Sequence, residues 1–586
     1  MSQITESIHG FIREVDPNQF IISATEVELE DLFCQDLFKS LLIDFTQTSV
    51  FSKELGDEFI SVGAIEGVSA CRKLRSSLNL KTKEFFALLA EVALAFDQTK
   101  GEAWKQLSEG VYASREADTK LLDRLRTCGE SEFYTELAER LVEENPHAIY
   151  PTSNYRESKG YTVSTEDDQA VEAVMSCSTF TSIRITENAL DLSNTLLRDK
   201  FLPKGRCVCL VDKNVEHYYG EQLTNYFAHY NIAFKKLVYR AMEVDKGINT
   251  VEQMLGDFKR VGVSRNEPVL IVGGGVISDT GGLACALYHR NTPYIMLSTS
   301  IVAGIDAGPS PRTCCDGFGY KNLFGAYHAP VLSVTDRSFF STLHKGWLRH
   351  GVAEIIKMAV VKDAKLFGYL EQANTRLLDT SFGTVNCDKD DEINDLSQKI
   401  LGAAMRSYVE AEYDNLYETH QCRPHAYGHT WSPGFEIKAG LLHGHAVAIG
   451  MGWGAYLSYR NEWIDEAALQ RILTLISTFE LSLWHNILLD EETLWAAQEK
   501  MIEKRGGNLV APLPKGDVGQ CGYLNKLTRE ELQQAIGEYR ELCQRFPREG
   551  RGVEPLCSDV GLEDPSTVYS GSEIDQNTLE ETETIM

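Results

Sequence analysis

A glycine-rich turn between an apolar run and a helical pattern is the feature that most constrains how this chain folds. The run Val269–Val272 is continuous and apolar, and it leads directly into Gly273, Gly274 and Gly275. A buried strand that passes through a glycine turn into a helix offers backbone N–H groups to a phosphate. Three glycines also permit close approach of a dinucleotide pyrophosphate, and Asp279 can accept hydrogen bonds from hydroxyl groups. The spacing differs from G-x-G-x-x-G, so a plain strand-to-helix turn is the alternative.

Length, charge and cysteine content restrict the class of protein. A chain of 586 residues is too long for one ordinary core, so two or three domains are expected. The net charge of -28 disfavours nucleic acid and anionic membranes as partners, so a phosphorylated substrate needs a local basic site. The 14 cysteines form no C-x-x-C ladder, which favours a reduced compartment. With no signal-peptide pattern and no run of about 18 apolar residues, we expect a cytoplasmic protein.

The pattern along the chain predicts four regions. Residues 1–145 have apolar residues at helical spacing but no chemical motif, which predicts a helical extension of unknown role. Within residues 160–345, β-rich runs alternate with helical patterns from about residue 178, which predicts a parallel α/β sheet with nucleotide-binding geometry. Residues 346–550 are mostly helical, a second domain. Residues 555–586 have no Lys or Arg and many acidic and hydroxyl side chains, which predicts a disordered tail.

The helical domain carries the second chemical constellation. Glu354 and Lys357 are three residues apart, so they share one face of a helix. Downstream, His429 and His443 each stand beside a glycine. Two neutral imidazoles with one carboxylate make a catalytic zinc site that keeps open positions for substrate oxygens. A single histidine is more often structural, but three separated ligand candidates in one domain favour a metal site.

Several of these blocks occur together in a known order. They are Gly273–Gly282, Ser298–Ser300, Asp306, Lys321–Tyr327, Ala353–Lys357, Gly428–Thr430 and His443–Val447. In order and spacing this set resembles dehydroquinate synthase and its relatives, the sugar phosphate cyclases, over about residues 180 to 545. The resemblance implies an α/β NAD-binding domain followed by an α-helical metal-binding domain, with NAD between them. It also implies zinc or cobalt held by Glu354, His429 and His443.

The same resemblance implies the remaining site residues. The positions that match NAD contacts are Asp212, Asn214, Glu243, Lys246, Gly273, Gly274, Gly275, Val276, Asp279, Thr299 and Ser300. The candidates for substrate contact and catalysis are Lys357, Lys321, Asn322, Asp306, Arg312, Arg290 and Glu410. Among these, Arg312 stands where the family usually has lysine. Arg290 matches an arginine that reaches the phosphate of the neighbouring subunit's substrate, which implies a homodimer.

The family's reaction explains why these groups occur together. Members use NAD transiently: a hydroxyl is oxidised, phosphate is eliminated, the ketone is reduced again, and the opened sugar closes by intramolecular aldol addition. Oxidation acidifies the neighbouring C–H bond, a metal polarises the oxygen that becomes the carbonyl, and hydride transfer belongs to the nicotinamide. The resemblance therefore implies a phosphate-eliminating lyase with no net redox change and a small sugar phosphate as substrate.

Departures from dehydroquinate synthase indicate the substrate. Glu410 stands where that enzyme has lysine, Ala426 replaces an asparagine, and Pro433 replaces a second histidine. These changes disfavour a substrate carboxylate and favour a neutral polyol end. Tyr427–Pro433 and the late block Arg548–Val553 resemble the branch that cyclises sedoheptulose 7-phosphate.

We therefore predict a C7 cyclitol of the 2-epi-5-epi-valiolone or 2-epi-valiolone type as the product. The segment Gly308–Asp316 matches neither the valiolone pattern nor the gadusol pattern well. Four alternatives remain open: desmethyl-4-deoxygadusol synthase, 3-dehydroquinate synthase, a metal-dependent polyol dehydrogenase, and a non-catalytic scaffold that works through its N-terminal extension.

Overall fold

The computed structural model describes residues 156–164, 171–318, 320–413, 415–418 and 420–562, which fall into two units. The described part of the first unit is an antiparallel hairpin of β1 (Arg156–Ser164) and β2 (Val171–Thr179). The sequence analysis placed the first strands at about residue 178 and did not anticipate this hairpin. The helical extension expected over residues 1–145 lies outside the described residues.

The second unit begins with a six-stranded sheet in which every pairing is parallel. Its spatial order is β3 (Ser182–Thr186), β10 (Leu332–Asp336), β7 (Tyr294–Ser298), β6 (Val269–Gly273), β4 (Arg206–Asp212) and β5 (Ala233–Tyr239). The chain leaves β4 for β5 on one side and then returns to place β6 on the other side. This reversal makes the β4–β6 boundary a topological switch point, the usual binding place in open α/β sheets.

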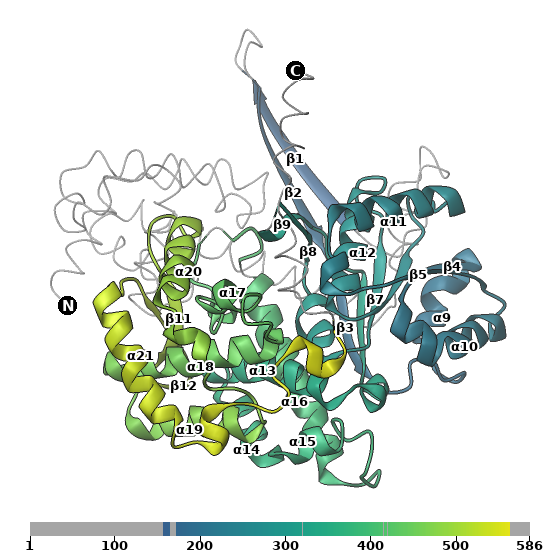
Figure 1. Cartoon of the computed structure of the whole chain (residues 1–586). Coiled ribbons are helices and arrows are strands. Elements are labelled where there is room, and N and C mark those ends of the chain that lie inside the picture. The colour runs from purple at the N-terminus through teal and green to yellow at the C-terminus, as the bar shows by residue number, and fades with distance from the viewer. Residues whose placement is uncertain (1–155, 165–170, 319, 414, 419, 563–586) are drawn as a thin grey trace, which may run out of the picture. The chain divides into compact units, whose positions relative to one another are not determined.

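Helices cover both faces of the sheet (Figure 1). Phe201 and Phe227 from α9 (Leu196–Phe201) and α10 (Lys213–His229) belong to the core on one face. Phe258 and Leu283 from α11 (Ile248–Val261) and α12 (Gly275–Leu287) belong to the core on the other face. The predicted α/β fold with a parallel sheet is confirmed. The shorter elements are 3-10 turns Leu202–Lys204, Glu243–Asp245 and Arg337–Thr342, the π-helical turn η3 (Ala303–Ala307), and the hairpin of β8 (Arg312–Gly317) and β9 (Tyr320–Tyr327).

The predicted helical part follows, and it is built around α13 (Lys345–Val361), whose residues from Val352 to Val361 are all buried. The other helices are α14 (Ala364–Ala373), α15 (Arg376–Asp379), α16 (Glu392–Tyr413), α17 (Ser432–Phe435), α18 (His443–Arg460), α19 (Glu466–Thr478), α20 (Glu491–Lys504) and α21 (Arg529–Cys543). A small hairpin of β11 (Ala511–Lys515) and β12 (Asp517–Leu524) and 3-10 turns Pro424–Ala426, Asn486–Leu489, Pro547–Gly550 and Cys557–Val560 complete it.

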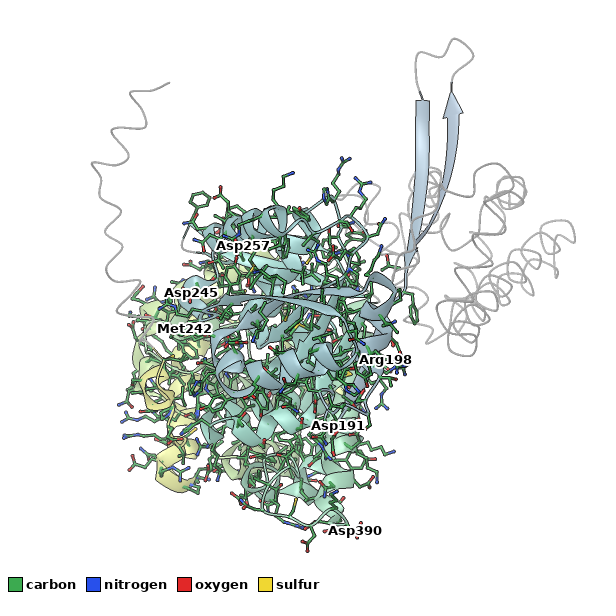
Figure 2. All side chains as sticks on the ribbon, turned by 90° about the vertical axis from the view of Figure 1, so that its right-hand side faces the viewer. Asp191, Arg198, Met242, Asp245, Asp257 and Asp390 are labelled. Atoms are coloured by element: carbon green, nitrogen blue, oxygen red, sulfur yellow. The ribbon has the colours of Figure 1, made fainter. Side chains whose placement is uncertain are left out.

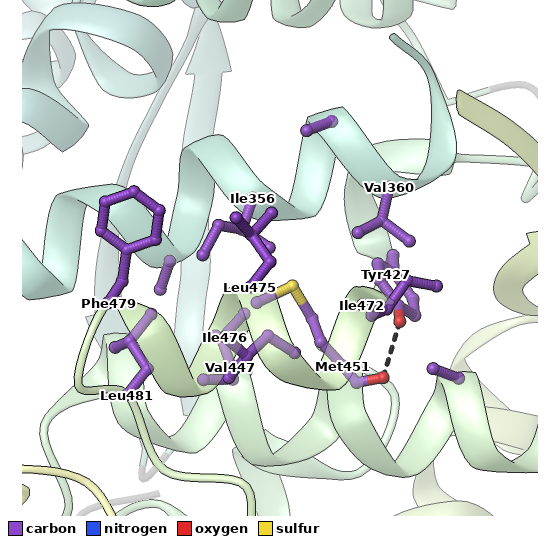
Figure 3. Packing of buried hydrophobic residues seen from close by; sticks show 14 of the residues in the cluster. Ile356, Val360, Tyr427, Val447, Met451, Ile472, Leu475, Ile476, Phe479 and Leu481 are labelled. Atoms are coloured by element: carbon purple, nitrogen blue, oxygen red, sulfur yellow. Dashed lines mark hydrogen bonds between the residues drawn. The ribbon is translucent and has the colours of Figure 1, made fainter. Parts of the chain in front are cut away.

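Helices α13 and α18 pack closely against each other, and this contact sets their relative position. Ile356 of α13 packs in one cluster with Val447 and Met451 of α18, and the Tyr427 hydroxyl donates to the Met451 carbonyl oxygen over 2.6 Å (Figure 3). A side chain at Gly444 would place its Cβ only 2.6 Å from the Cα of His350, so the two helices cross almost backbone to backbone.

The described residues also bear on the expected C-terminal tail and on membrane-spanning helices. In the segment expected to be a tail, Pro555 to Leu562 are described and pack on the helical part, while residues 563–586 lie outside the described residues. Within the described part of the chain, no helix combines the length and apolarity needed to cross a bilayer.

Candidate active site

Glu354, His429 and His443 converge in the helical part. Glu354 lies on α13, His443 begins α18, and His429 lies in the loop before α17. The ligand atoms of these three residues all lie within 4.8 Å of one another. The two Nε2 atoms are 3.3 Å apart, and they lie 3.6 Å and 3.5 Å from Glu354 Oε1. That carboxylate oxygen is buried and accepts no hydrogen bond from the described residues, so its lone pairs face the two imidazoles.

Neighbouring groups fix both imidazoles in the orientation that a metal ligand needs. The carbonyl oxygen of Tyr427 lies 3.0 Å from His429 Nδ1, and Glu436 Oε2 lies 2.9 Å from His443 Nδ1. Each Nδ1 can therefore donate a proton to an oxygen, and in the neutral imidazole with that tautomer each Nε2 directs a lone pair at the shared point. The donor set of two imidazoles and one carboxylate fits a catalytic zinc-type site with room for further ligands.

The other carboxylate oxygen of Glu354 is occupied by protein groups. The Tyr408 hydroxyl donates to Glu354 Oε2 over 2.7 Å, and Lys357 Nζ forms an ion pair with the same oxygen. Lys357 Nζ also lies 4.8 Å from the centre of the Tyr408 ring. Burial raises the pKa of Glu354, but the charge of Lys357 and the two neighbouring imidazoles outweigh burial and hold the pKa well below its usual value. Glu354 is thus an anion, as a ligand must be.

The two histidines differ in electrostatic setting. Burial and the charge of Lys357 lower the pKa of His429 to about 3, which keeps that imidazole neutral. Burial also lowers the pKa of His443, but the carboxylates of Glu436 and Glu354 outweigh it and raise that pKa to about 10. A cation between these carboxylates is therefore electrostatically favoured, whether it is a proton or a metal.

Lys321 joins the α/β part to this group. Its Nζ lies 3.0 Å from Glu436 Oε1 and 3.1 Å from Glu243 Oε1. Because Glu436 also binds His443, one carboxylate connects the predicted substrate lysine to a candidate metal ligand. Sequence reasoning missed Glu436 and Tyr408, which sit outside the matched blocks and reach the site only through the packing of α16 and α17.

The glycine turn lies at the switch point of the sheet. Gly273 ends β6, and a Cβ there would lie 2.5 Å from Ile277 Cγ2 and 3.0 Å from Asp212 Cβ. Gly274 is the N-cap of α12 and provides no side-chain cap, so the first N–H groups of Gly275 and Val276 remain available to a ligand. Asp212 ends β4, so the loops after β4 and β6 meet at one edge of the sheet.

The loop after β7 joins the same edge. The backbone N–H of Thr299 donates to the Gly273 carbonyl oxygen over 3.0 Å, and Ser300 Oγ is 3.5 Å from the position of a Cβ on Gly274. Asp212 accepts from the backbone N–H of Asn214 over 2.7 Å, and Asn214 itself is exposed. The predicted cofactor residues of the three loops are thus brought together.

Lys246, Asp279 and Asn322 form a second polar cluster near the glycine turn. Lys246 Nζ lies 2.7 Å from Asp279 and 2.8 Å from the side-chain oxygen of Asn322. Glu243 and Lys246 lie on either side of Asp245, which accepts from the Met242 N–H over 3.2 Å and from Arg240 over 2.7 Å. Figure 2 labels Met242 and Asp245 in this turn. This turn presents Lys246 to Asp279 on α12 and Glu243 to Lys321.

Asp306 and Arg312 lie near Lys357 and Glu354. Burial raises the pKa of Asp306, and the charges of Lys357, Glu354 and Arg312 all act on it. Arg312 forms ion pairs with Glu412 and, over 2.6 Å, with Glu418. The prolines of Gly308–Asp316 precede this arginine.

Contacts from α16 hold that segment. Ser310 Oγ donates to Glu412 Oε2 over 2.9 Å, and the Tyr413 hydroxyl donates to the Pro309 carbonyl oxygen over 2.9 Å. The unusual proline-rich segment is therefore docked on the end of the helix.

The structure does not bring Glu410 together with the triad and Arg312. Glu410 lies on α16 with a side chain 54% exposed, 3.6 Å from Lys362 and 3.7 Å from Arg406. Two residues further on, Glu412 is buried and pairs with Arg312. A shift of two residues turns a helix by about 200°, so only one of these glutamates faces the site.

Arg290 is likewise apart from the group. It is exposed, with a positive φ of 61°, in the turn between α12 and β7. Its predicted role toward a neighbouring subunit stays a prediction.

Several basic side chains gather around His425. Arg423 lies 2.9 Å from Glu418 Oε2 and 3.2 Å from His425 Nε2, which is 3.5 Å from Arg312. Burial and the charge of Arg423 lower the pKa of Arg505 to about 10, and the same two causes lower that of Lys504. Burial is the larger cause of both shifts, and repulsion from the Arg423 guanidinium adds to it. The sequence analysis missed this cluster, although Arg423 stands six residues before His429 and Lys504–Arg505 is a basic pair.

The α/β sheet, the glycine turn at its switch point and the metal-type triad define a class of two-part, nucleotide- and metal-binding folds. Family models agree: 3-dehydroquinate synthase N-terminal matches residues 236–350, and 3-dehydroquinate synthase C-terminal matches residues 351–501. The chain belongs to the 3-dehydroquinate synthase-like family of sugar phosphate cyclases.

The chain is also similar to individual members of this family. A demethyl-4-deoxygadusol synthase of Trichormus variabilis is 38% identical over 370 residues, 63% of this chain and 89% of the relative. A 2-epi-5-epi-valiolone synthase of Actinoplanes sp. is 36% identical over 331 residues, 56% of this chain and 81% of the relative. Among solved structures, 2-epi-5-epi-valiolone synthase from Streptomyces hygroscopicus subsp. jinggangensis, with NAD+ and Zn2+ bound, is similar with a TM-score of 0.58 and 32% identity, covering 62% of this chain and 98% of that one.

Proposed function

We propose that this protein is a phosphate-eliminating sugar phosphate cyclase, a lyase that converts sedoheptulose 7-phosphate into a C7 cyclitol and inorganic phosphate. The observation that carries the proposal is the convergence of Glu354, His429 and His443 beside Lys357, with both imidazoles anchored through Nδ1. The solved valiolone synthase supports it, because that similar protein holds NAD+ and Zn2+.

The residues fit zinc or cobalt at the triad and NAD at the glycine turn. The buried Glu354 Oε1 and two imidazole nitrogens match a divalent cation, and Gly273 to Val276 leave N–H groups for a pyrophosphate. Asp212 and Asn214, at the end of β4, have the position for ribose hydroxyls. When bound, the metal supplies Lewis-acid polarisation of a substrate oxygen, and NAD supplies the hydride acceptor.

The chain's own groups divide the remaining work. Lys357 and Lys321 place N–H donors next to the triad, where they pair with Glu354 and Glu436 and can hydrogen-bond substrate hydroxyls. Asp306, whose pKa is raised by burial, can accept or return a proton between Lys357 and Arg312. Asn322, paired with Lys246, lies between the cofactor and substrate sides.

The cations around His425 support a phosphorylated substrate. Among the described residues, Arg423 pairs with Glu418 and its charge acts on Lys504 and Arg505, in a chain whose net charge is -28. We assign the phosphate of the substrate to this cluster, because a dianion would pair favourably with several basic side chains. The exposed Arg290 remains the candidate contact from a second subunit in a homodimer.

The product is proposed to be of the 2-epi-5-epi-valiolone or 2-epi-valiolone type, as the Tyr427–Pro433 and Arg548–Val553 blocks suggest. Demethyl-4-deoxygadusol is the second candidate, because a synthase of that compound is 38% identical to this chain. Dehydroquinate is disfavoured, since the acidic side chain facing Arg312 is Glu412 and Ala426 offers no amide. A substrate carboxylate there would meet a charge of its own sign.

Product analysis tests the proposal. Purified protein with NAD and Zn2+ is incubated with sedoheptulose 7-phosphate, or with the seven-carbon acid substrate of dehydroquinate synthase, and the products are identified by NMR. We expect a cyclitol and free phosphate from the first compound and little conversion of the second. Turnover of only the acid would overturn the substrate assignment, and no turnover of either would favour the non-catalytic scaffold.

A further inference from the structure

The last described segment of the chain lies beside the residues that lead into His443. We call Arg551–Leu562 the C-terminal strap. Two backbone hydrogen bonds join the strap to Gly440–Leu442. The Leu442 N–H donates to the Pro555 carbonyl oxygen over 2.8 Å, and the Cys557 N–H donates to the Gly440 carbonyl oxygen over 2.9 Å. Leu442 is the N-cap of α18 and has no side chain that could cap it, so these bonds set where the helix starts.

A second contact reaches the first turn of α18. Ser482 Oγ accepts from the N–H of Gly552 over 3.0 Å and lies 2.9 Å from Nδ1 of the fully buried His445. A Cβ on Gly552 would lie 2.5 Å from His445 Cε1 and 2.7 Å from the Glu480 carbonyl oxygen. Only glycine fits between them, so the strap is pressed against the residue two positions after His443.

A third contact reaches α13, the helix of Glu354. The Arg349 side chain is only 4% exposed, and it pairs with Glu480 over 2.8 Å and with Glu554 of the strap over 2.7 Å. Burying a guanidinium is costly unless its donors are paired, so losing one carboxylate leaves an uncompensated charge five residues before the ligand.

We propose that the C-terminal strap is a positioning element of the metal site, which holds the starts of α18 and α13 so that His443 and Glu354 converge. The strap acts through Gly440–Leu442, His445 and Arg349. It lies beyond residue 501, where the matched family model ends. This inference rests on the proposed metal site, and it adds residues that are not ligands but hold the ligand-bearing helices in place. Loss of such support typically weakens metal binding by about 10- to 100-fold.

Truncation is the first test. A chain ending at Glu554 loses the Pro555 and Cys557 bonds, and a chain ending at Leu562 keeps them and is the matched control. Each apo protein is titrated with Co2+ in competition with a chelator, and the visible absorption of the bound ion is recorded. We expect the shorter chain to bind Co2+ about tenfold or more weakly with an altered spectrum, and the control to stay within about twofold of the full chain.

Point variants decide the matter if the shorter chain does not fold. Gly552→Ala inserts a methyl group against His445, whereas Gly537→Ala on α21 meets nothing within 4 Å. We expect weaker Co2+ binding and a changed spectrum only in Gly552→Ala. Unchanged affinity and spectrum in folded Gly552→Ala protein, with metal lost from His443→Ala, would overturn the strap's role alone. Metal retained by His443→Ala would instead overturn the metal site itself.

Discussion

Replacing Glu436 by glutamine tests whether the site depends on the charge behind His443. In the structure Glu436 Oε2 lies 2.9 Å from His443 Nδ1, and Oε1 lies 3.0 Å from Lys321. The amide keeps an acceptor but loses the charge, which costs about 1–2 kcal/mol, the difference between a charge-assisted and a neutral hydrogen bond. We therefore expect metal affinity to fall roughly 5- to 30-fold in Glu436→Gln.

The assay is Zn2+ or Co2+ binding by chelator competition, with thermal unfolding of the apo protein measured alongside. Glu371→Gln is the matched control, since it removes the same charge from an exposed pair 2.9 Å from Arg471. The reasoning is refuted if Glu436→Gln binds metal as tightly as the control while both proteins stay folded. It is also refuted if both variants lose affinity equally.

Three further substitutions give distinct expectations. Glu410→Gln should leave kcat/KM within about twofold of the parent, because exposed pairs of this kind contribute little, and a large loss would restore the sequence-based assignment. Arg423→Gln should raise KM for the phosphorylated substrate about tenfold or more with a smaller change in kcat, and an unchanged KM would move the phosphate elsewhere. Gly273→Ala should weaken NAD binding in calorimetry, because its Cβ would lie 2.5 Å from Ile277 Cγ2, while metal content stays near that of the parent. NAD binding equal to the parent would contradict the placement of the cofactor.

The order of motifs predicted the fold and named the candidate triad, because each motif is a short local block. Val269–Val272 and the glycines specify a strand, a turn and a helix with little help from elsewhere. The ligands Glu354, His429 and His443 were found because each lies in a short block whose order matches a family. The hairpin Arg156–Thr179 was missed, since its turn lacks a strong two-residue signal.

The supporting residues could not be found in the same way. Glu410 and Glu412 are both glutamates near one helix end, and only the packing of α16 decides which one faces Arg312. The contacts of Tyr408 with Glu354 and of Glu436 with His443 form only when distant segments of the chain pack together. The Arg548–Val553 block was noticed as a resemblance, but its hydrogen bonds to segments about 70 residues earlier, such as Gly552 to Ser482, follow from tertiary structure alone.

The most direct test of the central claim is to follow phosphate and NADH together. Protein holding NAD and Zn2+ is mixed with excess sedoheptulose 7-phosphate, inorganic phosphate is measured, and the absorbance of reduced nicotinamide is recorded in the same reaction. A cyclase returns the hydride in each cycle, so we predict many equivalents of phosphate per site with no lasting NADH. Stoichiometric accumulation of NADH without phosphate release would contradict the account and identify a polyol dehydrogenase.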